Sequence, residues 1–337
     1  MRQTLLLAGL IGLVGCSGNN GSGTTAGKTK IAIVSNNPEE FWTIAEKGAE
    51  KAAKDFDCSV VFRKPDKGEV QAQRDIVNAL AEQGVQGMAI SVIDPVNQAP
   101  DLKLIAGKLK LITMDNDAEK SDRICYVGTD NIAAGKSAGR LVAKALPAGG
   151  TVAVFVGQIS PLNAKQRFDG VMEALREVEK AKGVKYTLYK NEAITDGANR
   201  EQAQINARQA LEQLGNEPNV CMVGLWAYNA PACLEAVKSK GLAKKVKIVA
   251  FDEMDATLTG ITAGEIEGTV VQDPFNFAYQ SVEILAAEIK GDTSKRTKTA
   301  VPHRIITGDG KVPEGETGTG MTAAAFKADL DIKLGRK

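Results

Sequence analysis

The chain has 337 residues, a length that favours two lobes over a single core, and 43% of its residues are hydrophobic. Lys and Arg total 42 against 41 for Asp and Glu, so no net field exists to concentrate a nucleic acid or an acidic membrane. Aromatic residues make up only 5% of the chain, so the expected core is aliphatic and each aromatic side chain is informative.

The N-terminal segment is predicted to lie outside the folded domain. An apolar run over residues 5–14 follows Arg2 and is too short to span a bilayer, which is typical of a signal peptide over residues 1–15. The run ends in LVGC, which resembles a bacterial lipobox, so we expect Cys16 to be lipidated and to anchor the chain to a membrane. Residues 16–28 are rich in Gly, Ser, Thr and Asn and are predicted to form a flexible tether.

From Lys30 onward, short β-rich apolar runs alternate with longer helical patterns, which is typical of βαβ units and parallel sheets. In the first half, strands are predicted over 30–35, 59–63, 87–91, 111–115 and 124–128, and helices over 39–56, 69–82 and 96–106. The pattern then restarts, with strands over 151–157, 185–190, 220–225, 247–252 and 268–272, and helices over 165–180, 199–214 and 230–240. In the tail, only a last crossover and a helix near 323–328 are predicted.

Two successive five-strand units predict an α/β protein with two doubly wound parallel-sheet lobes. Ligands of such sheets bind at the carboxyl ends of the strands, where two lobes can face each other. The residues at the strand ends are therefore the candidates for a binding site.

The first strand ends in SNNPEEFW, in which Phe41 and Trp42 open a helix. A sugar presents hydroxyls around its rim and C–H groups on its faces, so its site needs flat aromatic surfaces together with planar hydrogen-bonding groups. Phe41 and Trp42 could supply such a face, and the alternative for each is packing of the helix against the sheet.

The later strand ends carry mostly carboxylates and amides: Ser91 with Asp94, Asp115-Asn116, Thr129-Asp130-Asn131, Phe251-Asp252 and Gln272-Asp273. An Asp after a strand is also a common helix cap, so the set, more than any single member, predicts a polar binding site. Arg167 is expected in the first turn of a helix, where the dipole disfavours a cation, and a ligand hydroxyl would help to explain it. The alternative for Arg167 is a surface ion pair.

Four cysteines follow Cys16, and each lies in or beside an apolar element: Cys58, Cys125, Cys221 and Cys233. Export would permit disulfides, but we expect buried free thiols. The chain has no CxxC pair and a single histidine, His303, which argues against a zinc site. We expect neither a metal nor a cofactor.

Residues 30–289 resemble the ribose-binding-protein-like receptors, the type I periplasmic solute-binding proteins of ABC transporters. The segments that carry the resemblance are KIAIVSNNPEEFW, IVNALAEQGVQGMAI, LITMDND, VGTDNIAAG, AKQRFDG, VAFDE and GTVVQDP. The resemblance implies ligand contacts at Asn37, Phe41, Trp42, Asp115, Arg167, Phe251, Asp252 and Gln272. Four of these would hydrogen-bond hydroxyls: Asp115, Arg167, Asp252 and Gln272.

The resemblance also implies that the chain crosses between the lobes three times, near Thr129, Asp273 and Val301. The N-terminal lobe would comprise 29–129 plus 273–301, and the C-terminal lobe 130–272 plus 302–337.

Three positions depart from the pattern of ribose receptors. Ser91 and Asn116 stand where those receptors carry Asn and Arg, and Trp226 stands at an Asn position. We keep all three as candidate ligand contacts. The departures argue against ribose itself and leave other monosaccharides, polyols, inositols or a furanosyl signal molecule open.

The resemblance implies a monomeric, lipid-anchored receptor outside the cytoplasm that binds a monosaccharide or related polyol and delivers it to an ABC transporter permease. One alternative is a sensory receptor coupled to a chemoreceptor or kinase. Another is a carbohydrate enzyme that uses carboxylates alone, but the chain has no GxSxG elbow, no Walker loop and one histidine. The presence of the lipobox and the absence of an N-terminal helix-turn-helix argue against a repressor.

Overall fold

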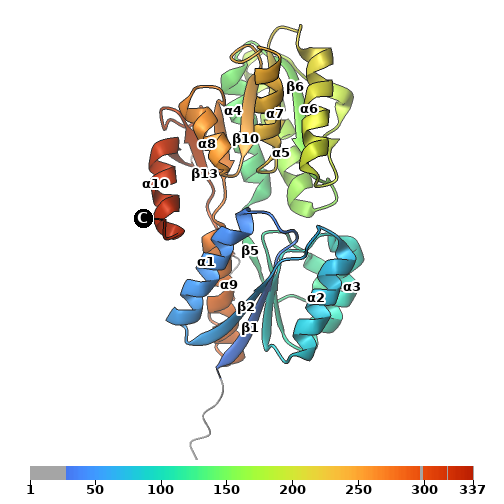
Figure 1. The fold of residues 1–337 in the computed structure, drawn as a ribbon, viewed down its shortest axis with the longest axis vertical. Helices are drawn as coiled ribbons and strands as arrows, with labels where there is room; N and C mark the ends of the chain where they lie inside the picture. The colour runs from blue at the N-terminus through green and yellow to red at the C-terminus, as the bar shows by residue number, and fades with distance from the viewer. Residues whose placement is uncertain (1–27, 297–298, 317, 337) are drawn as a thin grey trace, which may run out of the picture.

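The computed structural model describes residues 28–296, 299–316 and 318–336. These residues form two α/β lobes that follow each other along the long axis of the molecule (Figure 1). The predicted signal peptide, the predicted lipidation site Cys16 and most of the predicted tether lie outside the described residues. Within the described ranges, no helix combines the length and hydropathy that a membrane span requires.

The first lobe is built on a sheet whose six described strands run parallel in the order β12-β5-β4-β3-β1-β2. Its strands are β1 (Thr29–Val34), β2 (Cys58–Arg63), β3 (Gly87–Ile90), β4 (Lys110–Met114), β5 (Tyr126–Gly128) and β12 (Thr299–Ala300). One face packs on α1 (Phe41–Asp55) and α9 (Pro274–Ile289), and the other on α2 (Val70–Glu82) and α3 (Pro95–Ala106). A short 3-10 turn, η1 (Glu119–Ser121), follows β4.

The second lobe is built on a sheet of eight described strands in the order β14-β13-β11-β10-β9-β6-β7, with β8 paired to β6. Its strands are β6 (Gly150–Val156), β7 (Tyr186–Leu188), β8 (Ile194–Thr195), β9 (Val220–Gly224), β10 (Lys247–Phe251), β11 (Gly268–Val271), β13 (Arg304–Thr307) and β14 (Thr319–Thr322). Only the described pair β11 and β13 is antiparallel.

Helices cover both faces of this second sheet. The helices on one face are α4 (Asn131–Ala145) and α5 (Leu162–Lys182). Those on the other are α6 (Arg200–Leu214), α7 (Asn229–Ser239), α8 (Asp255–Thr262) and α10 (Ala323–Lys333). A 3-10 turn, η2 (Tyr189–Asn191), follows β7. The fold class predicted from the alternation of strands and helices is confirmed.

The chain passes between the two sheets three times. The passages lie between β5 and α4, between β11 and α9, and between β12 and β13. This arrangement supports lobe boundaries near residues 129, 273 and 301, which we adopt as a proposal. In Figure 1 the chain enters the first lobe at the end farthest from the junction between the lobes, whereas α10 ends close to that junction.

The structure corrects several predicted elements. The helix expected at 165–180 begins at Leu162, directly after Pro161, so Arg167 lies in its second turn and the dipole argument for a ligand partner does not apply. The strand expected at 185–190 ends at Leu188, because Lys190 adopts a positive φ of 59° that no strand can continue.

The tail contains more secondary structure than the predicted crossover and helix. It adds β13 and β14 to the second sheet and forms a helix that runs to Lys333 instead of 328. Helices α4, α8 and α9 were not among the predicted helices. The four described cysteines are free and buried, as predicted.

Candidate ligand-binding site

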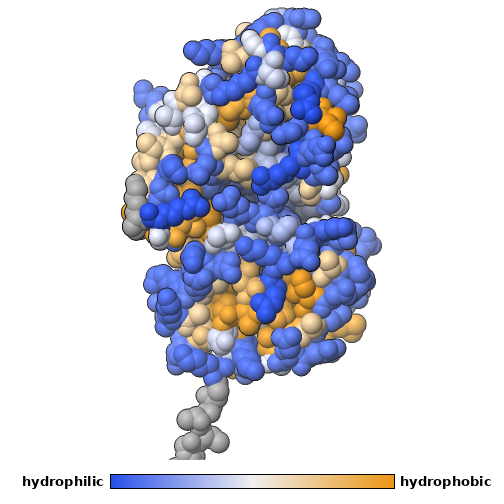
Figure 2. Space-filling model, viewed as in Figure 1, coloured by the Kyte–Doolittle hydropathy of each residue, from blue (hydrophilic) through white to orange (hydrophobic). Residues whose placement is uncertain are grey.

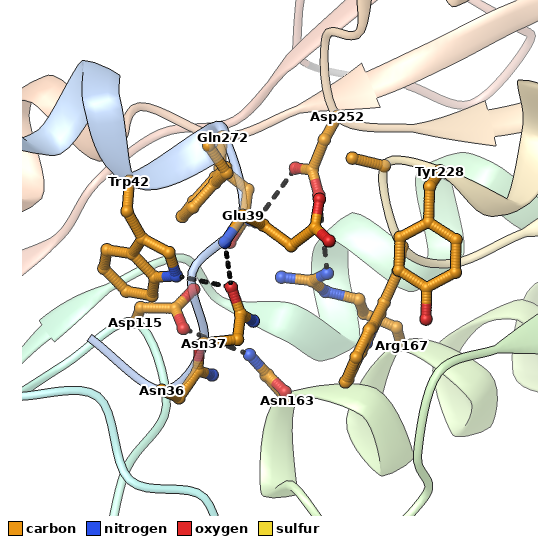
Figure 3. A pocket seen from close by; sticks show the side chains of 13 residues that line it. Asn36, Asn37, Glu39, Trp42, Asp115, Asn163, Arg167, Tyr228, Asp252 and Gln272 are labelled. Carbon is orange, nitrogen blue, oxygen red and sulfur yellow. Dashed lines mark hydrogen bonds and ion pairs between the residues drawn. The ribbon is translucent and has the colours of Figure 1, made fainter. Parts of the chain in front are cut away.

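A pocket lies between the lobes, with about 450 Å³ of space unoccupied by protein atoms (Figure 3). Thirteen residues from both lobes line it: Asn36, Asn37, Glu39, Phe41, Trp42, Asp115, Asn163, Arg167, Trp226, Ala227, Tyr228, Asp252 and Gln272.

Two buried carboxylates from opposite lobes face this pocket. Asp115 follows β4 in the first sheet and Asp252 follows β10 in the second, so each stands at the carboxyl end of a parallel strand. Ser91 Oγ donates to Asp115 Oδ2 at 2.8 Å, and Gln272 Nε2 donates to Asp252 Oδ1 at 3.0 Å. These partners fix the orientation of each carboxylate before a ligand arrives.

Arg167 of α5 supplies the positive charge of the pocket. Its Nε donates to Asn131 Oδ1 at 2.9 Å and its Nη1 to the Leu225 carbonyl at 3.1 Å, while Nη1 lies 4.0 Å from Asp252 Oδ2. Its guanidinium also stacks over the Phe251 ring, 4.1 Å from the centroid. The guanidinium is therefore positioned by Asn131, Leu225 and Phe251 while it lines the pocket. The alternative of a surface ion pair is wrong because Arg167 is buried.

Burial dominates the electrostatics of both carboxylates. It raises the pKa of Asp115 to about 6, while Arg167 and the Ser91 hydrogen bond act in the opposite direction. Burial likewise raises the pKa of Asp252, against the same opposing charge of Arg167 and the hydrogen bond from Gln272. Such carboxylates gain from hydroxyl donors, which stabilise their charged form.

Aromatic side chains enter the pocket from both lobes. The Phe41 and Trp42 rings meet edge to face at 5.1 Å, and Trp42 Nε1 donates to Asn37 Oδ1 at 3.1 Å. Trp42 is nearly fully buried in the core of the first lobe and also lines the pocket. It therefore both packs its helix against the sheet and offers a surface to a ligand. On the other side, Trp226 and Tyr228 meet edge to face at 6.2 Å.

Gly157, at the end of β6, makes room for Trp226. A Cβ atom at this position would lie 2.1 Å from Cε3 of the indole and 2.6 Å from the Tyr228 hydroxyl. Only glycine therefore allows the aromatic pair to sit where it lines the pocket.

Several buried acceptors in the pocket lining are unsatisfied. Asn36 Oδ1, Asn163 Oδ1 and Gln272 Oε1 have no hydrogen-bond partner among the described residues. Because buried polar atoms in folded proteins are nearly always paired, such acceptors indicate a ligand that brings hydrogen-bond donors. Asn163 and Arg167 lie four residues apart on α5, so one helix face delivers an amide and a guanidinium to the same pocket.

The structure brings eight of the eleven predicted ligand contacts together in the pocket lining: Asn37, Phe41, Trp42, Asp115, Arg167, Trp226, Asp252 and Gln272. Three predicted contacts do not line it. Ser91 and Phe251 lie behind it, supporting Asp115 and Arg167, and Asn116 accepts from the Asn163 backbone N–H at 3.1 Å.

Sequence reasoning missed five lining residues: Asn36, Glu39, Asn163, Ala227 and Tyr228. Helical spacing from Arg167 was a usable signal for Asn163. The loop that carries Ala227 and Tyr228 offered no such signal.

Polar contacts join the lobes beside the pocket. Glu39 of the first lobe forms an ion pair with Arg200 of the second, whose guanidinium also lies 5.8 Å from the Tyr228 ring centroid. Asn163 of the second lobe donates its backbone N–H to Asn116 Oδ1 at 3.1 Å and its Nδ2 to Asp115 Oδ2 at 3.5 Å, both in the first lobe. Among the described residues, no group of three or more His, Cys, Asp or Glu side chains is arranged to hold a metal ion.

The fold and the interlobe pocket define a two-lobed binding protein, and the comparison with protein families agrees. The family described as periplasmic binding protein domain matches residues 31–293, so the chain belongs to this family.

Among relatives, the D-allose-binding periplasmic protein of Escherichia coli is 25% identical over 259 residues, covering 73% of this chain and 79% of the relative. An ABC transporter solute-binding protein from Burkholderia graminis, solved in complex with D-arabinose, superimposes with a TM-score of 0.76 at 25% identity, covering 83% of this chain and 95% of that one. GanP, a glucose-galactose binding protein from Geobacillus stearothermophilus, has the same TM-score and identity, covering 84% of this chain and 98% of that one.

Proposed function

We propose that this chain is an extracytoplasmic solute-binding protein that captures a monosaccharide between its lobes and delivers it to an ABC transporter permease. The observation that carries the proposal is the lining of the interlobe pocket, where two buried carboxylates, a guanidinium and unsatisfied amide oxygens lie beside aromatic rings. The relatives named for D-allose, D-arabinose and glucose-galactose support a sugar as the ligand.

The lining matches the chemistry of a pyranose or furanose ring. Asp115 and Asp252 can each accept two hydroxyl donors, and Arg167 can donate to a ring or hydroxyl oxygen. Gln272 and Asn163 add amide groups that both donate and accept. The aromatic edges of Phe41 and Trp226 face the remaining apolar surface of such a ligand.

Closure of the lobes would transmit binding to the permease. Because Asp115 comes from the first lobe and Arg167 and Asp252 from the second, a ligand that contacts all three stabilises the closed form over the open one. The Glu39–Arg200 ion pair forms only when the lobes meet and adds to this preference. A permease that recognises the closed surface then receives loaded receptors.

We also propose that Cys16 carries a lipid that anchors the chain outside the cytoplasm. The lipobox-like LVGC sequence supports this assignment. Metabolic labelling with a palmitate analogue tests it: the intact chain should incorporate label, and Cys16→Ser should not. Incorporation into the Cys16→Ser variant would contradict the anchor.

A thermal-shift screen against pentoses, hexoses, polyols and inositols tests the ligand class. The protein should first be unfolded and refolded to remove any carried ligand. A ligand that binds only the folded state at a hundredfold over its Kd adds about 2.7 kcal/mol, which is visible as a higher Tm. A selective hit among monosaccharides supports the proposal, and no shift across the panel contradicts it.

Transport and sensing use the same pocket, so a second measurement separates them. Uptake of the identified sugar by cells that lack this chain should fall and should recover when the chain is restored. Normal uptake in those cells, together with a lost transcriptional or chemotactic response, would replace delivery to a permease with a sensory role.

A further inference from the structure

A second pocket adjoins the sugar site and is not used by the function proposed above. It contains about 510 Å³ of space unoccupied by protein atoms and lies between α1, the segment that follows β10, and the end of α10. Phe41, Ala227 and Asp252 line both pockets, so the two are neighbours. Figure 2 shows hydrophobic surface at the level of the lobe junction, close to the C-terminal end of the described chain.

Both lobes contribute to this second pocket. Ile44 on α1 belongs to the same hydrophobic cluster as Phe326 and Leu330 on α10. Arg336 beyond α10 lies 3.7 Å from Glu40, the residue that precedes α1. The walls therefore come together only when the first and second lobes are in contact.

Glu253 is the unusual residue of this pocket. It directly follows Asp252, is only 8% exposed, and lines the second pocket. Its Oε2 is buried and has no hydrogen-bond partner among the described residues. An acid in this position is costly to ionise, and a cationic or hydrogen-donating ligand would offset that cost.

The nearby cations are already engaged with other acids. Arg304 lies 3.2 Å from Asp329 and 3.8 Å from Asp273. Lys333 lies 3.4 Å from Asp329 and 3.5 Å from Asp273. Burial, together with Asp252 and Asp273, raises the pKa of Glu253 well above its ordinary value, although Arg304 and Lys333 act in the opposite direction.

The remaining walls define the rest of the ligand. Ile44, Met254, Leu330 and Leu334 supply apolar surface. The charged residues that line this pocket in the described chain are mostly acids: Glu40, Asp252, Glu253 and Asp255. Arg336 is the one cation among the described lining residues, and it lies beside Glu40 and Asp331. An apolar stem would lie against the aliphatic side chains, and a cationic head would meet the acidic end.

We propose that this second pocket binds a primary amine carried on a short apolar stem, with Glu253 as the partner of the ammonium group. The amine can be a separate molecule or a substituent of the ligand in the first pocket, because the two pockets share Phe41, Ala227 and Asp252. In either case its binding favours the closed form, since its walls come from both lobes. The proposal does not require the first ligand to be a sugar.

Benzylamine and benzyl alcohol are matched probes for this site, because they share a stem and differ in charge. We expect benzylamine to raise the Tm of the full chain in a saturable manner and to bind at least tenfold more tightly than benzyl alcohol. Glu253→Gln keeps the shape of the side chain but cannot carry a negative charge, so this variant should lose the preference for benzylamine. Glu82→Gln, at an exposed residue of α2 away from the pocket, should keep it.

Leu334→Ala provides a second variant that does not touch the acid. Leu334 is the half-buried C-cap of α10, so the substitution should leave the fold intact. It should weaken benzylamine binding severalfold by removing contact with the stem. Equal benzylamine binding by the wild type, Glu253→Gln and Leu334→Ala would overturn the proposal, and so would equal affinity for the two probes.

A third arm of the experiment identifies the source of the amine. If saturating sugar from the screen tightens benzylamine binding in a Glu253-dependent manner, the amine is a separate molecule. If sugar excludes benzylamine while binding still depends on Glu253, one ligand with an amino substituent spans both pockets. Should no sugar bind, the proposed function fails, while the comparison of wild type with Glu253→Gln still tests the second pocket.

Discussion

Asp115 and Asp252 leave their strands with nearly equal positive φ angles, 63° and 64° respectively, and their carboxylates face one pocket from opposite lobes. A positive φ is unfavourable for a residue with a Cβ atom and occurs preferentially at functional sites. The two sheets thus present equivalent acids at equivalent strand ends.

We predict that Asp115→Asn and Asp252→Asn each weaken sugar binding by about 1.5–3 kcal/mol, roughly tenfold to a hundredfold, because each removes hydrogen bonds to a charged acceptor. Asn tolerates a positive φ, so the fold should persist. Titration calorimetry with the sugar found in the screen measures the loss. Asp94→Asn is the control, since Asp94 caps α3 after β3 and does not line the pocket. Unchanged affinity in both pocket variants would remove these acids from the site.

The elevated pKa of Asp115 predicts a pH-dependent stability. Its pKa is about 6 in the folded protein against 3.8 ordinarily, so between these values the folded state binds more protons than the unfolded state. This contribution to the free energy of unfolding is fully present below about pH 4 and is lost as the pH rises through 6. Its size is on the order of 3 kcal/mol.

Urea unfolding of the wild type and Asp115→Asn from pH 4 to pH 7 measures this effect. The variant should gain stability relative to the wild type as the pH rises, because groups that do not interact with Asp115 cancel in the difference. Asp252, whose pKa is also raised by burial, should behave in the same direction. A difference that does not change with pH would show that Asp115 is not desolvated in solution.

Gly157→Ala should disturb the aromatic wall of the pocket. The added Cβ would meet Trp226 at 2.1 Å, so the indole must move and sugar affinity should fall by tenfold or more. The only two tryptophans, Trp42 and Trp226, both line the pocket, so the emission change on sugar binding reports the effect directly. Gly107→Ala is the control, because its Cβ would have only ordinary contacts. A normal emission change and affinity in Gly157→Ala would place Trp226 away from the ligand.

The ion pair between Glu39 and Arg200 should act on the lifetime of the closed form. Both side chains are partly exposed, so the pair contributes about 1 kcal/mol or less. Glu39→Gln should therefore speed sugar release up to about fivefold in stopped-flow measurements, and added salt should have a similar effect on the wild type. Lys165→Gln, which breaks an exposed pair with Asp169 inside α5, should not change release. Identical release rates in Glu39→Gln and the wild type would show that the pair does not hold the lobes together.

The arrangement of the lobes shows which features could be predicted from local patterns. Apolar runs such as β4 and β10 are buried on both faces, so they stand out as continuous hydrophobic segments, and the acids that follow them mark the carboxyl ends of the strands. The strand ends beside Trp42 and Gln272 are therefore predictable from local patterns, whereas the place of Arg167 at the site was implied by the family resemblance.

Other features depend on contacts between segments that are distant in the sequence. Ser91 and Asp115 both follow strands of the first sheet, yet the Ser91 hydroxyl donates to the Asp115 carboxylate and stands behind it, because packing decides which side chain reaches the cavity. The Glu39–Arg200 ion pair joins residues that are 161 positions apart.

The two α/β units, the strand ends that carry the site and the aromatic residues beside them follow from short periodic patterns of burial, so they can be predicted from the order of residues. Contacts between distant segments decide instead that the C-terminal segment completes the second sheet, that α10 ends against α1, and that Glu253 is buried beside a second pocket. Burial of an acid depends on the side chains that surround it, and here those come from both lobes.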